Sequence, residues 1–291
     1  MGLYAIAVWL LCGLVTDHLW LQFACFVISS YLMVELNNSN ALIRIYSRMV
    51  SCSFIMMVCM STFLLQSSKG MMLSICVVMS FVMAFLSYQD KYSMGRIFYS
   101  FMSIGIGSMI DVSVLFFVPV MWLAMFFHLQ SMTLRTFISS LFGLICPYWF
   151  VAVYLIYTND ITLAVEHFSQ LAVFGKVANF SQVPVSALVS ICYITILSVV
   201  GIIHYLRNRV FDKTRTRMFY NTFILFDIFT IAFIILQPQH YATMLIILIV
   251  TTSPLIAHFI ALTNTWITNL AFKVIVATAL SLTIINILQL I

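Results

Sequence analysis

The chain is poor in charge: only 7% of its 291 residues are Asp, Glu, Lys or Arg, whereas 64% are hydrophobic. A soluble domain carries about 25% charged and about 45–50% apolar residues. A water-soluble fold of this length cannot hide so much apolar surface, so we expect lipid as the surrounding medium. In hydrocarbon, only helices and closed barrels satisfy every backbone polar group.

Motifs of soluble enzymes are also missing. The chain has no Walker loop, no GxSxG, no HExxH and no dinucleotide-binding glycine pattern. Its seven cysteines lie within apolar stretches and form no CxxC pair or metal-like spacing, so we interpret them as small buried hydrophobes. We therefore expect no cofactor and no metal. No basic tract with interleaved aromatic residues indicates nucleic acid.

Long continuous apolar runs are what the sequence has in abundance. They favour transmembrane helices, because barrel strands alternate over only about 10 residues. The pattern predicts an all-α polytopic bundle, a single transmembrane domain over residues 1–291 with about eleven spans and at least about nine. The predicted spans are 2–15, 19–35, 49–66, 71–88, 95–110, 113–128, 134–157, 185–206, 218–236, 241–262 and 266–288.

Three of the connections between predicted spans differ from the others in composition or length. Residues 36–48 begin with helix-capping side chains and predict an interfacial amphipathic segment. Residues 158–184 form the longest polar connection and predict an external segment with an interfacial helix. Residues 207–217 predict a basic cytoplasmic loop.

The basic residues predict the orientation. Ten of them fall on even-numbered connections, and only Lys69 and Lys176 fall on odd ones, while Lys273 lies inside the last span. Because cytoplasmic loops carry the excess of Lys and Arg, this bias places the N-terminus inside and the C-terminus outside.

Ionisable residues inside predicted spans are candidate functional residues, because they are costly in hydrocarbon. Asp227 lies in the middle of 218–236, His258 follows Pro254, and Lys273 is about two turns into the last span. One hypothesis is a buried Asp–His–Lys cluster for ion coupling or for a polar ligand. The alternative is a structural role, with Lys273 extending to the headgroups.

Other candidates lie near the membrane surfaces. Asp17 and Asp111 fall on predicted external connections, where paired carboxylates can serve acid–base catalysis, or are ordinary surface residues. Four cytoplasmic arginines match lipid phosphates in geometry, or serve only to orient the chain: Arg44, Arg48, Arg96 and Arg135. Gly105 and Gly107 lie within one span and predict close helix packing.

Three stretches carry a resemblance to a known family: ELNNSNALIRIYSR at 35–48, YQDKYSMGRIFYS at 88–100, and FFVPVMWLAMFF with TLRTFISSLFGLICPYWF within 116–150. Together they resemble an uncharacterised family of multi-span inner-membrane proteins of Bacteroidota. The resemblance covers residues 30–157 and implies a cell inner membrane, without an activity to carry over.

The middle of the chain is also similar, more weakly, to multi-span (C-type) lipid-linked-sugar glycosyltransferases. Shared features are a proline-containing span, a basic cytoplasmic turn and a span with proline towards its end. Those enzymes place a catalytic acid on a substantial first external loop, whereas this chain has only a short loop around Asp17.

These observations leave three functional hypotheses. The first, which the absence of catalytic motifs favours, is a non-enzymatic inner-membrane protein of cell-envelope biogenesis, a subunit that packs against other inner-membrane subunits and membrane lipids. The second is a transporter or flippase that uses Asp227, His258 and Lys273. The third is a lipid-carrier-dependent glycosyltransferase-like enzyme that uses Asp17 and Asp111.

Overall fold

The computed structural model describes residues 1–158, 162–175, 177–263 and 265–289, and every regular element in these ranges is helical. The all-α prediction is therefore confirmed. The α-helices are α1 (Gly2–Leu11), α2 (Trp20–Asn40), α3 (Met49–Met60), α4 (Thr62–Gln66), α5 (Ser68–Phe85), α6 (Met94–Ile110), α7 (Val118–Phe127), α8 (Leu134–Thr158), α9 (Thr162–Ser169), α10 (Val185–Asn208), α11 (Thr214–Leu236), α12 (Tyr241–Leu262) and α13 (Trp266–Leu288). Short 3-10 helices are η1 (Val112–Phe117), η2 (Gln170–Ala172), η3 (Phe180–Gln182), η4 (Arg209–Phe211) and η5 (Pro238–His240).

Seven helical segments in the described part of the chain are long and apolar enough to cross a bilayer. They are α2, α5, α8, α11, α13, α10 continued by η4, and η5 continued by α12. The chain is thus a helical membrane protein. The remaining predicted spans correspond to shorter or interrupted helices: α1 is about 15 Å long, half of a hydrocarbon core of about 30 Å.

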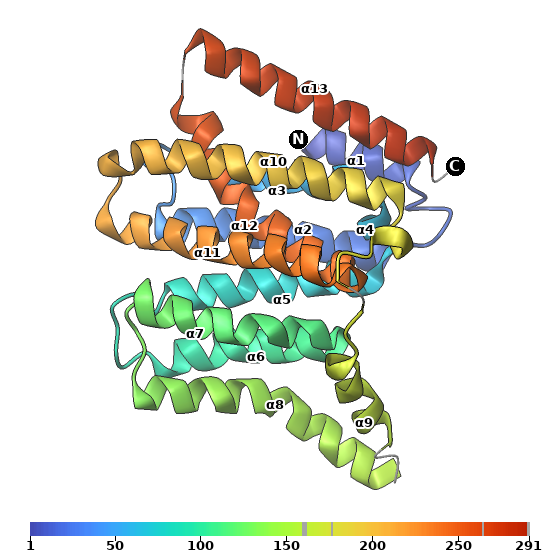
Figure 1. Cartoon of the computed structure of the whole chain (residues 1–291), viewed down its shortest axis with the longest axis vertical. Coiled ribbons are helices and arrows are strands. Elements are labelled where there is room, and N and C mark those ends of the chain that lie inside the picture. The colour runs from blue at the N-terminus through green and yellow to red at the C-terminus, as the bar shows by residue number, and fades with distance from the viewer. Residues whose placement is uncertain (159–161, 176, 264, 290–291) are drawn as a thin grey trace.

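Helix α12 forms the centre of the bundle and packs against α3, α5, α10 and α11 (Figure 1). Every residue from Thr243 to Phe259 is buried, as expected for a helix surrounded by other helices. Helix α11 instead buries one stripe, which includes Phe219, Phe223, Phe226 and Asp227. Its phenylalanines stack on α5 and η1, so the interior around α11 and α12 is filled by rings.

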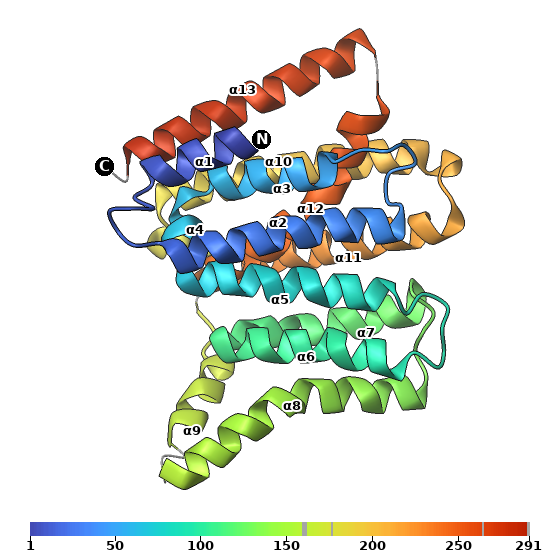
Figure 2. The same ribbon diagram turned by 180° about the vertical axis from the view of Figure 1, so that it is seen from behind.

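Two helices lie at the margins of this bundle, α8 at one end of its long axis and α13 at the other (Figures 1 and 2). Helix α8 packs mainly on α6 and buries only Thr136, Ser140, Gly143 and Pro147. These small residues recur at helical spacing, so they form a narrow stripe along which two backbones can approach. Most of the apolar surface of α8 and α13 therefore faces outwards.

The connections that carry the basic residues gather at one end of the bundle, the left end in Figure 1 and the right end in Figure 2. We call this the basic end; it comprises residues 41–48, 86–93, 128–133 and 208–213 with the adjoining helix ends. Contacts tie these segments together: Gln89 N–H donates to Leu129 O at 2.8 Å, and Arg215 donates to Asn40 at 3.3 Å. The opposite end carries the connection between α1 and α2, and α9 (Figure 1).

The three special connections differ in detail from their predictions. Residues 36–40 complete α2, which ends at Asn40. Ala41 follows with φ of 47°, and residues 41–48 are not helical. The connection predicted to be external does contain a short helix, α9, although residues 159–161 and 176 lie outside the described ranges. In the basic loop, α11 begins at Thr214, one turn before the predicted span. Lys213 is its N-cap residue, and residues 214–217 are helical and continuous with the apolar part of the helix.

Candidate intramembrane polar site

Asp227 is the most deeply placed carboxyl group in the described structure, fully buried about 20 Å from the start of α11. Its carboxyl oxygens accept hydrogen bonds from hydroxyls on two neighbouring helices. Ser198 Oγ of α10 donates to Oδ2 at 2.5 Å, and Thr252 Oγ1 of α12 donates to the same oxygen at 3.1 Å. Thr251 of α12 donates to Oδ1. Asp227 therefore joins α10, α11 and α12 through one group.

No Lys, Arg or His side chain within the described ranges forms an ion pair with Asp227. An isolated charge in a low-dielectric interior costs far more than a hydrogen-bonded neutral group. Three hydroxyl donors satisfy a carboxyl group without a counter-ion. The arrangement suits a hydrogen-bonded junction between helices better than an ion-pair network.

A second polar cluster lies about 10 Å farther along α12, towards the basic end, and is centred on His258. His258 is fully buried, and its Nε2 lies 3.1 Å from Oδ2 of Asp212, in the connection between α10 and α11. Its Nδ1 lies 3.3 Å from Nδ1 of His204 on α10. If Asp212 accepts from the Nε2–H, His258 Nδ1 is left to accept from His204, so the three groups form a continuous chain.

Two stacked tyrosines enclose the His258 ring. The Tyr220 ring centroid is 5.0 Å from that of His258, and the Tyr205 centroid is 5.8 Å away. The guanidinium of Arg44 lies over the ring of Phe211, the residue that precedes Asp212 in the sequence. The cluster is therefore a buried imidazole that holds the connection between α10 and α11 against α12.

Close packing positions both clusters. At Gly201 of α10, an added Cβ would lie 2.8 Å from the carbonyl carbon of Leu255 on α12, so only glycine permits this approach. Gly201 lies between Ser198 and His204 on the same helix. The contact thus brings one side chain to Asp227 and the other to His258.

The structure does not bring Lys273 into either cluster, so the expected cluster of three residues separates into two sites and one isolated lysine. Lys273 is exposed on α13 and makes no hydrogen bond or ion pair with any described residue. The physical reason is that α13 packs on α3 and α4, away from α11.

Asp17 and Asp111 also lie apart. Asp17 is exposed in the turn after α1, next to Gly13. Asp111 caps η1 by accepting from Ser113 N–H at 2.9 Å, and it accepts a hydrogen bond from Thr243 of α12. Burial raises the pKa of Asp111, but the hydrogen bonds from Ser113 and Thr243 outweigh it, so the net pKa is lowered. Asp111 is thus a local cap and a tie to α12.

The four arginines have different surroundings. Arg44 lies over Phe211, and Arg48 donates to the hydroxyl of Tyr46 at 3.4 Å. Arg96 donates to Leu86 O at 2.5 Å and lies 3.6 Å from Asp90.

Arg135 makes no hydrogen bond or ion pair with a described residue and is exposed beside a groove between α6 and α8. Of the four arginines, Arg135 is the one that lines this groove, and its guanidinium has no polar partner among the described residues.

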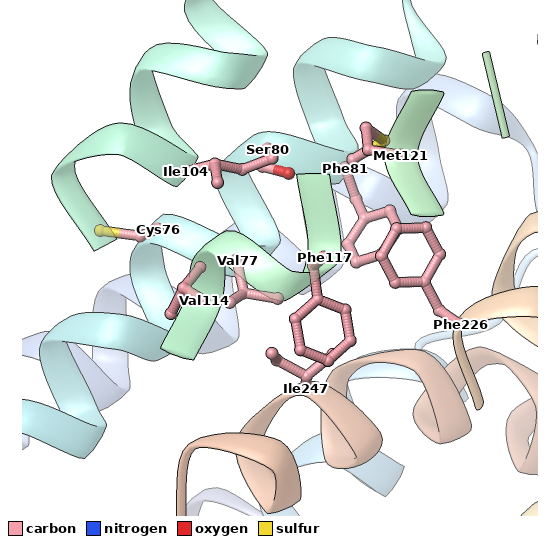
Figure 3. Close-up of a pocket in the computed structure, with 10 residues that line it drawn as sticks. All are labelled: Cys76, Val77, Ser80, Phe81, Ile104, Val114, Phe117, Met121, Phe226 and Ile247. Carbon is pink, nitrogen blue, oxygen red and sulfur yellow. The ribbon is translucent and has the colours of Figure 1, made fainter. Parts of the chain in front are cut away.

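A small interior cavity lies beside Phe226, the neighbour of Asp227 (Figure 3). It has a volume of about 20 Å³, and its lining is apolar apart from Ser80. A water needs two to four polar partners to occupy such a space. The rings of Phe81, Phe117 and Phe226 border it in Figure 3, so this cavity gives no polar route to Asp227.

The sequence analysis did not identify the partners of the intramembrane residues. In the sequence, Asp212 is one residue of a basic loop, and His204 lies near the end of an apolar span. The one available signal was the spacing on α10 and α12, where Ser198, Gly201 and His204 share a face, as do Thr251 and His258.

The chain was also compared with known proteins. No protein-family model, curated protein or solved structure matches it.

Proposed function

We propose that the chain is a multi-pass protein of the cell inner membrane with about eleven spans, its basic end and N-terminus in the cytoplasm and its C-terminus outside. The shorter helices support this count: α1, α3 with α4, α6, and η1 with α7 fill the positions of the predicted spans that are too short or interrupted to qualify alone. The gathering of basic connections at one end supports the orientation.

Within that membrane, we propose that the protein is a non-enzymatic subunit of an envelope-biogenesis complex. One observation carries this proposal: the fully buried carboxyl group of Asp227 and the fully buried imidazole of His258 each pair with side chains of neighbouring elements. Asp227 is held by hydroxyls of α10 and α12, and His258 by Asp212 and His204. Such an interior suits a rigid scaffold, and the outward surfaces of α8 and α13 are available to partners.

Purification from native membranes in mild detergent, followed by native mass spectrometry, tests this proposal. We expect a complex of fixed stoichiometry with at least one other membrane protein. The Asp227→Asn variant should yield the same complex, because its amide can still pair with the three hydroxyls. Recovery of the chain only as a lipid-bound monomer, both in detergent and in lipid nanodiscs formed directly from the membrane, would contradict a subunit role.

A second function, proton-linked transport, is favoured by one specific feature. The chain Asp212–His258–His204 offers a path on which a proton taken up by His204 could pass through the imidazole of His258. Asp227 of α11, which pairs with Thr251 and Thr252 about two turns from His258 along α12, would then be the next protonatable group, although no contact between the two clusters joins them in the described structure.

Proteoliposomes with an entrapped pH-sensitive dye distinguish the two functions. With a potassium gradient and valinomycin, a scaffold should show the proton leak of protein-free vesicles. Proton entry above that leak, abolished in both His258→Gln and Asp227→Asn but retained in Lys273→Gln, would instead establish transport. No observation favours the glycosyltransferase-like enzyme, since Asp17 and Asp111 serve separate local roles.

A further inference from the structure

A groove of about 730 Å³ runs along the outer junction of α6 and α8. Phe98 of α6 forms one wall, and Ile138, Phe142 and Trp149 of α8 form the other. These three side chains of α8 are 44%, 63% and 68% exposed, so the groove is open on its outer side. It lies on an outward face of a membrane helix, where hydrocarbon is the neighbouring medium.

The groove exists because the two backbones approach closely behind it. A Cβ on Gly143 would lie 2.5 Å from the carbonyl oxygen of Phe98, and one on Gly105 would lie 2.8 Å from that of Leu144. The second contact confirms the close packing predicted for Gly105. Ser139 Oγ also donates to Met94 O at 2.7 Å and ties the two helices near the basic end. The bulky side chains therefore stand beside the contact and leave a fixed channel between them.

One end of the channel is cationic and the remainder is apolar. Arg135, the second residue of α8, lines the groove at the basic end, and Trp149 lies 14 residues later, about 21 Å along the helix. This length exceeds the depth of one leaflet, which is about 15 Å. The adjoining end of α6 is also positively charged, because residues 90–96 contain the two basic residues Lys91 and Arg96 and one acidic residue, Asp90.

We propose that this groove binds an anionic phospholipid from the leaflet at the basic end, with the phosphate on Arg135 and one acyl chain along Phe98 and Phe142. The guanidinium of Arg135, which has no hydrogen-bond or ion-pair partner among the described residues, is available for the phosphate oxygens. The ring-lined channel is long enough for an acyl chain. The site is independent of the subunit role and relies only on the chain being embedded in a bilayer.

Photocrosslinking in nanodiscs tests the site. Phosphatidylglycerol and phosphatidylcholine, each with a diazirine near the middle of one acyl chain, are incorporated separately, and labelled peptides are mapped by mass spectrometry. We expect phosphatidylglycerol to label α8 around Phe142 about fivefold more than phosphatidylcholine does, the ratio that about 1 kcal/mol per basic residue gives. Labelling of α13, which is also open to lipid, should not depend on the headgroup in the Lys273→Gln variant, where this helix carries no basic residue.

Substitutions provide the matched comparison. Arg135→Gln should reduce the headgroup preference on α8 to near unity, whereas Arg135→Lys should keep much of it. Lys273→Gln removes one positive charge from α13 and should leave the preference on α8 unchanged. Three results would each overturn the proposal. The first is equal labelling of α8 by both lipids, and the second is a headgroup preference that survives Arg135→Gln in a variant with normal gel-filtration behaviour. The third is an α8 that stays unlabelled while α13 reacts. The last result would indicate that a protein segment covers the groove.

Discussion

Removal of the Asp227 carboxyl group should destabilise the bundle by a predictable amount. Three interhelical hydrogen bonds depend on it, from Ser198, Thr251 and Thr252. Hydrogen bonds between transmembrane helices contribute about 0.6 kcal/mol on average and at most about 1.7 kcal/mol. Asp227→Ala should therefore lower the free energy of unfolding by about 2 kcal/mol, and by no more than about 5 kcal/mol. Asp227→Asn should cost less than about 1 kcal/mol, because hydroxyls can donate or accept.

Thr230 supplies a matched control on the same helix. It is fully buried one turn beyond Asp227, but its hydroxyl donates to Phe226 O within α11. Thr230→Val should thus change stability far less than Asp227→Ala does. Unfolding in bicelles with added denaturing detergent, followed by circular dichroism, measures all three variants.

One result would refute the junction described for Asp227. If Asp227→Asn is as destabilising as Asp227→Ala, the negative charge itself must be required, and a cation must neighbour it in the folded protein. The hydrogen-bonded junction predicts a clear gap between these two variants.

Three further predictions address packing, pH and orientation. Gly201→Ala should cost about 1–3 kcal/mol through overpacking at the crossing of α10 and α12, whereas Gly95→Ala, with no atom within 4 Å of its Cβ, should cost nothing measurable by the same unfolding assay. Because the pKa of Asp111 is lowered, the stability it contributes is fully present above about pH 4 and is lost as the pH falls through its folded value; Asp111→Asn should remove this part of the acid sensitivity in a pH series of melting curves. Single cysteines in place of Arg209 and Glu166 should react with a membrane-impermeant maleimide from opposite sides of sealed vesicles, and reaction from the same side would contradict the proposed orientation.

The sequence predicted the elements of this fold well and their partners poorly. Each predicted span coincides with helical structure, because long apolar runs leave the backbone no other solution in lipid. Interruptions within spans were not anticipated: α3 ends at Met60, and α7 is preceded by η1. Those breaks arise where local backbone geometry depends on neighbouring helices.

For the site residues, too, the sequence indicated which residues are unusual but not which residues they contact. Asp227 and His258 were recognisable from the sequence, since an ionisable group inside an apolar run stands out whatever surrounds it. The structure does not bring Lys273 to either of them, because comparable depth in a membrane does not imply contact. Asp212 lies 46 residues before His258, and its role depends on α10 and α11 returning to the same end of α12.

Composition and the order of apolar and basic residues along the chain determined the medium, the helical class and the end at which positive charge collects, because each follows from transfer free energies summed along the chain. Only the tertiary structure decided which helix became the centre, which hydroxyls satisfy Asp227 and which arginine stays free beside a groove. Those outcomes depend on close approaches at single glycines such as Gly201 and Gly143, and side-chain chemistry read in sequence order does not specify which helix will lie opposite.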